Sequence, residues 1–252
     1  YRKDIVIMIP KIIHYCWFGK GEKSTQVKKC IESWNRILID YQIIEWNEEN
    51  FDVGVNAYTK QAYENKKYAF VSDVARLYAL LNYGGIYLDT DVEVYRSFDE
   101  ILEHRCVFGF EYKNWIATSF LAAEKDHPLI QEFFKQYENI SFGLNKTNFN
   151  METNVEKITK LLEDKGVVRD NSYQEIAEGI VVYPKEYFSP YDYGNCVLEK
   201  TEHSICVHHF FVSWLPWQER IKKKLKRILV GIIGKRKMVE LRNKLRHQNE
   251  VE

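Results

Sequence analysis

The sequence predicts an α/β protein with one large domain. The chain opens with a strand, helix, strand pattern, which is how a parallel sheet begins, and helical and strand-like segments continue to alternate through its middle. Its 252 residues are 45% hydrophobic and 29% charged, which is typical of a soluble globular protein and excludes fibrous, collagen-like and disordered classes. We expect one large domain over residues 1–216, of a size typical of a catalytic domain, and a helical tail over residues 217–252.

The opening pattern has three parts. Residues 5–17 are apolar and β-branched, interrupted at Pro10, and predict a short buried strand. Ser24 is the expected N-cap of a helix, because apolar residues follow it at spacings of three and four. Residues 41–46 predict the second strand.

The strongest helical pattern covers residues 69–83 and ends at Gly84-Gly85. Residues 86–88 predict a buried strand immediately after it. The remaining expected elements are strands at 92–94, 106–110, 115–123 and 205–208, helices at 128–138 and 152–164, and a loop at 139–151.

The formal net charge of zero hides a strongly basic tail. Residues 218–252 hold 12 of the 36 Lys and Arg but four of the 36 Asp and Glu, so this segment carries +8 and the rest of the chain −8. Apolar residues from Ile221 to Ile233 form one face of an amphipathic helix, six Lys or Arg lie within residues 220–227, and a second basic helix is expected over 235–247. This pattern favours an anionic membrane surface as partner. The alternatives are packing on the protein's own body or a helical dimer seam; the acidic body argues against nucleic acid.

Cysteine usage and the start of the chain bear on location. The five cysteines are an odd number without CxxC pairs, which favours a reducing compartment over a disulfide framework or a zinc site. No stretch of about 18 apolar residues and no signal-peptide core is present, so we expect a cytoplasmic protein, peripheral on the inner face of the cell membrane. Met8 is a candidate natural start, which would make residues 1–7 an upstream extension.

Asp89-Thr90-Asp91 is the central chemical motif. It follows a Gly-Gly turn and a buried strand, so two carboxylates stand at a strand end. Such hard oxygen ligands suit Mn²⁺ or Mg²⁺, and a cation held there can neutralise a diphosphate leaving group.

Two further pairs are candidates for the same site. Asp73 and Arg76 share a face of the helix before the motif; they are either a surface ion pair or, because apolar residues surround them, groups that contact a sugar or phosphate. His208 and His209 are either core histidines or ligands that complete a metal shell.

Three sequence blocks resemble the DXD-containing sugar-transferase family (family 32-like), which includes fungal initiating mannosyltransferases and bacterial capsule and lipopolysaccharide enzymes. They are IPKIIHYCWFG at 9–19, SDVARLY with LNYGGIYLDTD at 72–91, and the segment 208–214. The resemblance implies a GT-A-type fold, a Rossmann-like mixed sheet flanked by helices. It also implies a nucleotide-sugar donor, a UDP-sugar before a GDP-sugar, and retention of anomeric configuration.

The resemblance also assigns roles to matching positions. It places Ile13, His14 and Trp17 at the nucleotide, Asp73 and Arg76 at the donor sugar, and Asp89 at the ribose or sugar. Asp91 becomes a metal ligand, joined by Asp89, by His209 and, second to it, by His208. Ser213 and Trp214 are placed at the diphosphate. Residues 125–200, where an acceptor is expected, match no motif.

The expected function is a metal-dependent retaining glycosyltransferase. It would act on a glycan or lipid-linked acceptor in surface polysaccharide synthesis. A non-catalytic nucleotide-sugar or glycan-binding protein on the same fold is the alternative. A phosphohydrolase using Asp89 as nucleophile is disfavoured, because that motif is expected on the first strand and here 88 residues precede it.

Overall fold

A seven-stranded mixed β-sheet forms the centre of the computed structural model, which describes residues 8–143, residues 152–211 and eleven separate positions between 218 and 237. The strand order is β2-β1-β3-β6-β5-β8-β7. The strands are β1 (Ile12–Cys16), β2 (Gln42–Trp46), β3 (Gly85–Leu88), β5 (Cys106–Gly109), β6 (Phe120–Ala123), β7 (Gln174–Ile176) and β8 (Ile180–Tyr183).

The first half of the sheet is parallel, as the opening pattern predicts. Strand β1 pairs in parallel with β2 on one side and β3 on the other, and helix α1 (Thr25–Ile37) makes the crossover between β1 and β2. Strand β6 then runs antiparallel to both β3 and β5. Strands β1, β2, β3 and β5 therefore end at the same edge of the sheet, where loops can bring side chains together.

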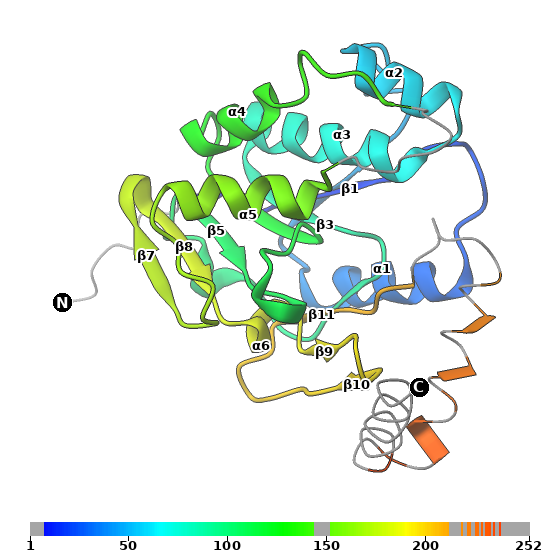
Figure 1. Ribbon diagram of the computed structural model, residues 1–252, viewed down its shortest axis with the longest axis vertical. Helices are drawn as coiled ribbons and strands as arrows, with labels where there is room; N and C mark the ends of the chain where they lie inside the picture. The colour runs from blue at the N-terminus through cyan, green and yellow to red at the C-terminus, as the bar shows by residue number, and fades with distance from the viewer. Residues whose placement is uncertain are drawn as a thin grey trace, which may run out of the picture.

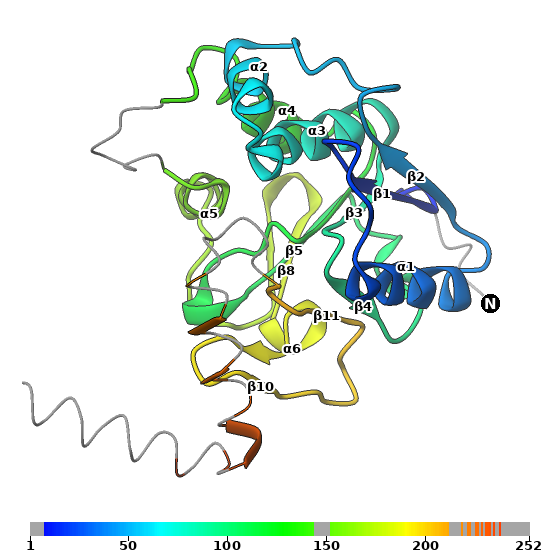
Figure 2. The ribbon, with the colours of Figure 1, turned by 90° about the vertical axis from the view of Figure 1, so that its right-hand side faces the viewer.

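Helices cover both faces of the sheet (Figure 1). One face carries α2 (Ala57–Glu64), α3 (Tyr68–Tyr83), α4 (Pro128–Lys135) and α5 (Asn154–Asp164), and the other carries α1 and α6 (Lys185–Phe188). Figure 2 shows the same division after a quarter turn. Side chains alternate along each strand, so β1 sends Ile13 and Tyr15 into one core and Cys16 into the other.

Local sequence explains the helix ends. The Ser24 side chain accepts a hydrogen bond from the Val27 amide, as predicted for an N-cap. Thr153 and Glu156 form a reciprocal capping box at the start of α5. Helix α3 ends at Gly84, whose φ of 65° is the left-handed conformation that glycine adopts readily.

The structure differs from the sequence prediction in several short elements. The strand expected over 115–123 is β6 alone, because residues 115–119 leave the sheet after a single bridge between Phe110 and Ile116. Strands β7 and β8 and helices α2 and α6 were not predicted. They have eight residues or fewer, too few for a periodic pattern to stand out.

Two small sheets flank the large one. Strand β4 (Val92–Val94) pairs antiparallel with β11 (Cys206–His208), and β9 (Tyr191–Asp192) pairs with β10 (Val197–Leu198). The β4–β11 pairing joins segments more than a hundred residues apart. It therefore brings the C-terminal histidines to the loop after β3.

The mixed sheet with helices on both faces confirms the predicted Rossmann-like fold class. All eleven described positions between 218 and 237 are helical, in agreement with a helical tail. Most of the expected second helix at 235–247 lies outside the described residues, and the boundary at 216–217 stays a prediction. Within the described part of the chain, no helix combines the length and apolar character needed to cross a bilayer.

Gly85 offers a test of the turn that leads into β3. Its φ is 109°, and a Cβ there would lie 2.5 Å from the Ile12 carbonyl oxygen of the neighbouring strand. We expect Gly85→Ala to lower the free energy of unfolding by about 2–4 kcal/mol, from backbone strain and overpacking. Urea unfolding measures this change. Gly21→Ala is the control, because a Cβ at Gly21 meets nothing within 4 Å, and an equal effect of both substitutions would contradict the prediction.

Candidate functional site: a carboxylate and histidine cluster

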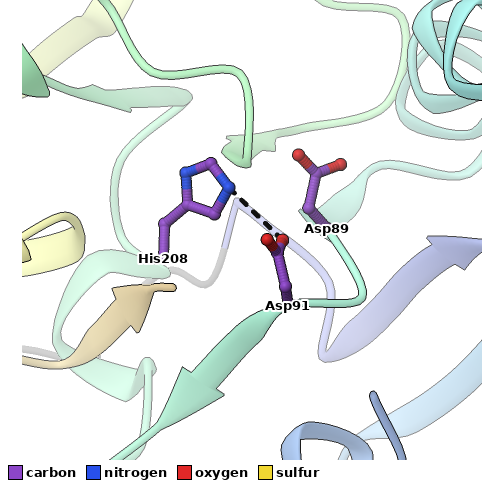
Figure 3. Close-up of side chains that lie close together, drawn as sticks. All are labelled: Asp89, Asp91 and His208. Atoms are coloured by element: carbon purple, nitrogen blue, oxygen red, sulfur yellow. Dashed lines mark ion pairs between the residues drawn. The ribbon is translucent and has the colours of Figure 1, made fainter. Parts of the chain in front are cut away.

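Asp89, Asp91 and His208 gather at the edge where β3 ends. Asp89 and Asp91 lie in the short loop between β3 and β4, and His208 is the last residue of β11. Because β11 pairs with β4, with His208 opposite Val92, its imidazole comes to the same loop. Figure 3 shows the three side chains lying close together, with the His208 ring directed at the Asp91 carboxylate.

The cluster has the spacing of a metal site. One potential ligand atom from each of the three residues lies within 4.8 Å of the other two. His208 Nε2 lies 3.3 Å from Asp91 Oδ1. Two carboxylates and one imidazole form a donor set that suits Mn²⁺ and can accept Mg²⁺, so these residues fit the predicted cation.

Charge and backbone contacts fix Asp91 within the cluster. The Phe211 amide donates to Asp91 Oδ2 at 2.8 Å. Burial disfavours the Asp91 carboxylate, but the charge and hydrogen bond of His208 together with the Phe211 amide lower the pKa of Asp91. Burial likewise disfavours a charged His208, but Asp91, followed by Asp89, raises the pKa of the imidazole. The two side chains therefore favour an ion pair, and because an imidazole binds a metal only in its neutral form, a cation held by His208 would take the place of the proton between them.

His209 does not join the cluster. The sequence favoured His209 over His208 as ligand, but the structure directs His209 Nε2 to Glu93 Oε2, at 2.9 Å. Its backbone amide donates to the Asp91 carbonyl oxygen. Successive residues of an extended chain point to opposite sides, so only one of the two histidines can face Asp91.

Arg76 connects Asp73 and Asp89 beside the cluster. Its Nη2 lies 3.2 Å from Asp73 Oδ1 and 3.4 Å from Asp89 Oδ1. Its Nη1 donates to the Thr118 carbonyl oxygen and its Nε to that of Ser72, and the guanidinium lies over the Tyr87 ring. The resemblance assigned Arg76 to the sugar, whereas the structure directs most of its N–H groups into the protein.

The polar partners of Asp73 gather on one of its carboxylate oxygens. Arg76 and Asn154 Nδ2, the latter at 2.6 Å, both contact Oδ1, whereas among the described residues none forms a hydrogen bond or ion pair with Oδ2. Burial raises the pKa of Asp73 to about 7, against the opposing charge of Arg76. A buried carboxylate with one open oxygen is suited to accept a hydrogen bond from a ligand hydroxyl.

The first sequence block contributes mainly to the core. His14 is fully buried: it accepts from Trp46 Nε1 at Nδ1 and donates from Nε2 to the Gly84 carbonyl oxygen. Burial lowers its pKa to about 4. The Ile13 side chain is also fully buried, on the opposite face. The expectation that these two side chains line a nucleotide pocket is corrected, because β1 lies between two strands and under helices on both faces.

Trp17 is better placed for a ligand. It follows β1 at the edge where β3 also ends, is partly exposed, and donates from Nε1 to the Gly21 carbonyl oxygen. Ser213 and Trp214 lie outside the described residues.

Three residues near the site were missed by sequence reasoning. Asn154 contacts Asp73, and the Tyr87 hydroxyl donates a hydrogen bond to Asp89 at 2.8 Å. Glu111 follows β5. Burial raises the pKa of its carboxyl group to about 7; the nearby charge of His208 acts to lower this pKa and that of Asp89 to raise it. The position of Glu111 just beyond a strand was the available signal, whereas nothing in the sequence pairs Asn154 with Asp73.

The Arg76 network is open to a stability test. We expect Arg76→Met to lower the free energy of unfolding by about 3–5 kcal/mol, because it leaves Asp73 buried without its countercharge. Arg96→Met is the matched control, since Arg96 forms an exposed pair with Glu100 and should cost less than about 1 kcal/mol. The loss in Arg76→Met should shrink when Asp73→Asn is added, as urea unfolding of the three variants would show.

Known proteins with similar sequences are glycosyltransferases, and the matched region contains residues of the candidate site. Residues 24–108 match the model of the glycosyltransferase sugar-binding region containing the DXD motif, a span that includes Asp73, Arg76, Asp89 and Asp91. Inositol phosphoceramide mannosyltransferase 3 of Schizosaccharomyces pombe is 28% identical over 142 residues, which are 54% of this chain and 39% of the fungal protein. The chain thus matches well under half the length of that relative. An uncharacterized glycosyltransferase of Acanthamoeba polyphaga mimivirus is 25% identical over 83% of this chain and 85% of its own.

Solved structures resemble the fold more remotely. The PaToxG glycosyltransferase has a TM-score of 0.47 at 18% identity and covers 63% of this chain and 70% of its own. The galactosyltransferase LgtC has a TM-score of 0.43 at 10% identity and covers 87% and 95%. These likenesses carry no information on donor or acceptor. The matched sugar-binding region and the fungal relative show that the chain is similar to glycosyltransferases containing the DXD motif, most clearly over residues 24–108.

Proposed function

We propose that this protein is a metal-dependent glycosyltransferase that moves a sugar from a nucleotide-sugar donor to a glycan or lipid-linked saccharide. The observation that carries the proposal is the convergence of Asp89, Asp91 and His208, from two distant parts of the chain, into one cluster of ligand atoms. The match to the DXD-containing sugar-binding region supports the reaction class, and the cluster supports the need for a metal.

The cluster would hold Mn²⁺ or Mg²⁺. A divalent cation bound there supplies positive charge that offsets the charge of the donor diphosphate. The protein's part is to fix the ligands in place. Phe211 and His209 hold Asp91 through backbone amides, and Tyr87 and Arg76 hold Asp89 through side chains. Ligands fixed in this way need little reorganisation when the donor binds.

Asp73 would bind the donor sugar. Its Oδ2 atom can accept a hydrogen bond from a sugar hydroxyl, while Arg76 and Asn154 keep Oδ1 and the carboxylate plane in position. Arg76 has contacts to both Asp73 and Asp89, so it sets the distance between the sugar-binding carboxylate and the cluster. In this proposal Arg76 acts mainly by positioning these two carboxylates.

The resemblance to the family supports a UDP-sugar as donor, before a GDP-sugar, and retention of anomeric configuration. In the retaining route the acceptor hydroxyl attacks the anomeric carbon from the face on which the nucleotide diphosphate departs. The hydroxyl proton passes to the leaving phosphate oxygen. This route needs no base placed on the opposite face of the sugar ring.

A lipid-linked acceptor in surface polysaccharide synthesis completes the proposal. The fungal relative is named for mannosyl transfer to inositol phosphoceramide, which is a lipid. The basic C-terminal segment gives an independent reason to expect work at a membrane surface, on the cytoplasmic side.

A donor screen tests the reaction class. We expect the protein with Mn²⁺ to release nucleotide slowly from one of UDP-galactose, UDP-glucose, UDP-N-acetylglucosamine or GDP-mannose, because transferases can pass the sugar to water when no acceptor is present. EDTA should stop the release, and Asp91→Asn should lower it by about 10²-fold or more, as expected for loss of a metal ligand. Chromatography of the released nucleotide measures the rate.

The screen also separates the alternative function. Thermal unfolding with each donor and Mn²⁺ reports binding without turnover. Binding of a donor that is never hydrolysed, even with candidate lipid-linked acceptors, would favour a non-catalytic nucleotide-sugar-binding protein. Absence of both binding and hydrolysis would contradict the proposal.

The two neighbouring histidines give a second test. We expect His208→Ala to weaken Mn²⁺ binding by about 10- to 100-fold, because it removes one ligand of the cluster. His209→Ala should leave Mn²⁺ affinity nearly unchanged, because His209 contacts Glu93 instead. Electron paramagnetic resonance titration of free Mn²⁺ measures both affinities. A larger loss in His209→Ala than in His208→Ala would show that the metal lies elsewhere.

A further inference from the structure

The described residues of the C-terminal segment form a helix with its apolar side chains facing outward. Ile221, Leu225, Ile228 and Ile232 are 46%, 59%, 51% and 75% exposed. At 100° per residue these four positions lie within an arc of about 60° on the helix. We call them the outer stripe. Large apolar side chains gathered on one exposed face mark an interaction surface more often than single exposed ones do.

The opposite side of this helix contacts the protein. Val230, on the far side from the outer stripe, is 6% exposed. Lys226 Nζ donates to the Gly194 carbonyl oxygen, in the turn between β9 and β10, at 2.6 Å. Figures 1 and 2 both place the described orange segments beside this hairpin. The helix is therefore attached by a side other than its apolar stripe, which argues against the stripe's packing on the protein's own body.

The charge around the outer stripe indicates what covers it. Six Lys or Arg lie within residues 220–227, and residues 218–252 carry 12 basic and four acidic side chains, a net charge of +8. Two copies of so basic a segment repel each other, whereas a surface of anionic lipid attracts it by about 1 kcal/mol for each Lys or Arg close to the membrane. An apolar stripe flanked by basic residues is typical of a helix lying in a bilayer interface.

We propose that the outer stripe inserts into the surface of a bilayer containing anionic lipid, with the helix parallel to the membrane. Ile221, Leu225, Ile228 and Ile232 would enter the boundary between headgroups and acyl chains. Lysines and arginines of the same segment would contact lipid phosphates. The contact is peripheral and reversible, because the inserted area is small compared with that of a membrane-spanning helix.

This placement would set the candidate site close to the membrane. Val230 and Gly231 line an open hollow together with His209 and side chains of the β9–β10 hairpin. His209 is the neighbour of His208 in the metal cluster. A lipid-linked acceptor could thus reach the site while its lipid part stays in the bilayer. This last point rests on the proposed function, but the membrane contact itself does not.

Vesicle co-sedimentation of the full chain tests the proposal without any donor. We expect binding to vesicles of phosphatidylcholine with phosphatidylglycerol, weakening as salt is raised, and little binding to phosphatidylcholine alone. Leu225→Ser combined with Ile228→Ser should lower the partition coefficient by about tenfold or more, because two side chains no longer insert. Since the assay needs no turnover, failure of the donor screen and failure of vesicle binding remain distinguishable.

Ile39→Ser is the matched control. Ile39 is 84% exposed and lies between α1 and β2, away from the segment, so its loss should leave vesicle binding unchanged. Circular dichroism checks that all variants are folded. No binding of the wild type to anionic vesicles, or equal binding of wild type and double variant, would overturn the proposal. So would a dimer in sedimentation velocity that becomes monomeric in the double variant, since the outer stripe would then be a seam between two copies.

Discussion

The buried guanidinium of Arg76 is the interaction on which the candidate site depends. It lies between Asp73 on α3 and Asp89 after β3, and it also binds the Thr118 carbonyl oxygen before β6. The buried carboxylate of Asp73, the partly buried carboxylate of Asp89 and the Thr118 carbonyl group come together here, and such a group of acceptors would be costly without a countercharge. The same side chain that offsets their charge therefore fixes the separation of Asp73, the proposed sugar-binding carboxylate, from the candidate metal cluster.

The second constraint is the pairing of β11 with β4. This short antiparallel sheet brings His208 to Asp91 and turns His209 toward Glu93. The two histidines are adjacent in sequence, yet the alternation of an extended strand gives them different partners. A shift of the pairing by one residue would exchange the two histidines, so the composition of the candidate metal cluster depends on strand register.

Site and C-terminal helix meet at the β9–β10 hairpin. Lys226 attaches the helix to the turn of this hairpin, and Val230 shares a hollow with His209. The outer stripe faces away from both. The segment is basic and the rest of the chain is acidic, and in our proposal this charge asymmetry would orient the protein at an anionic surface before any apolar side chain inserts.

The sequence by itself determined the α/β class, the parallel opening of the sheet and the caps at Ser24 and Gly84, and it singled out Asp73, Arg76, Asp89 and Asp91 as candidates for one site. These follow from local periodicity and from motifs whose members are close in sequence. Tertiary structure alone decided that His14 is a core residue, that Arg76 faces the protein, that Asn154 contacts Asp73 across 81 residues, and that His208 rather than His209 meets the carboxylates. Each of these depends on which side of a strand or helix a side chain occupies and on which distant segment packs there, and neither is encoded in the spacing of residues along the chain.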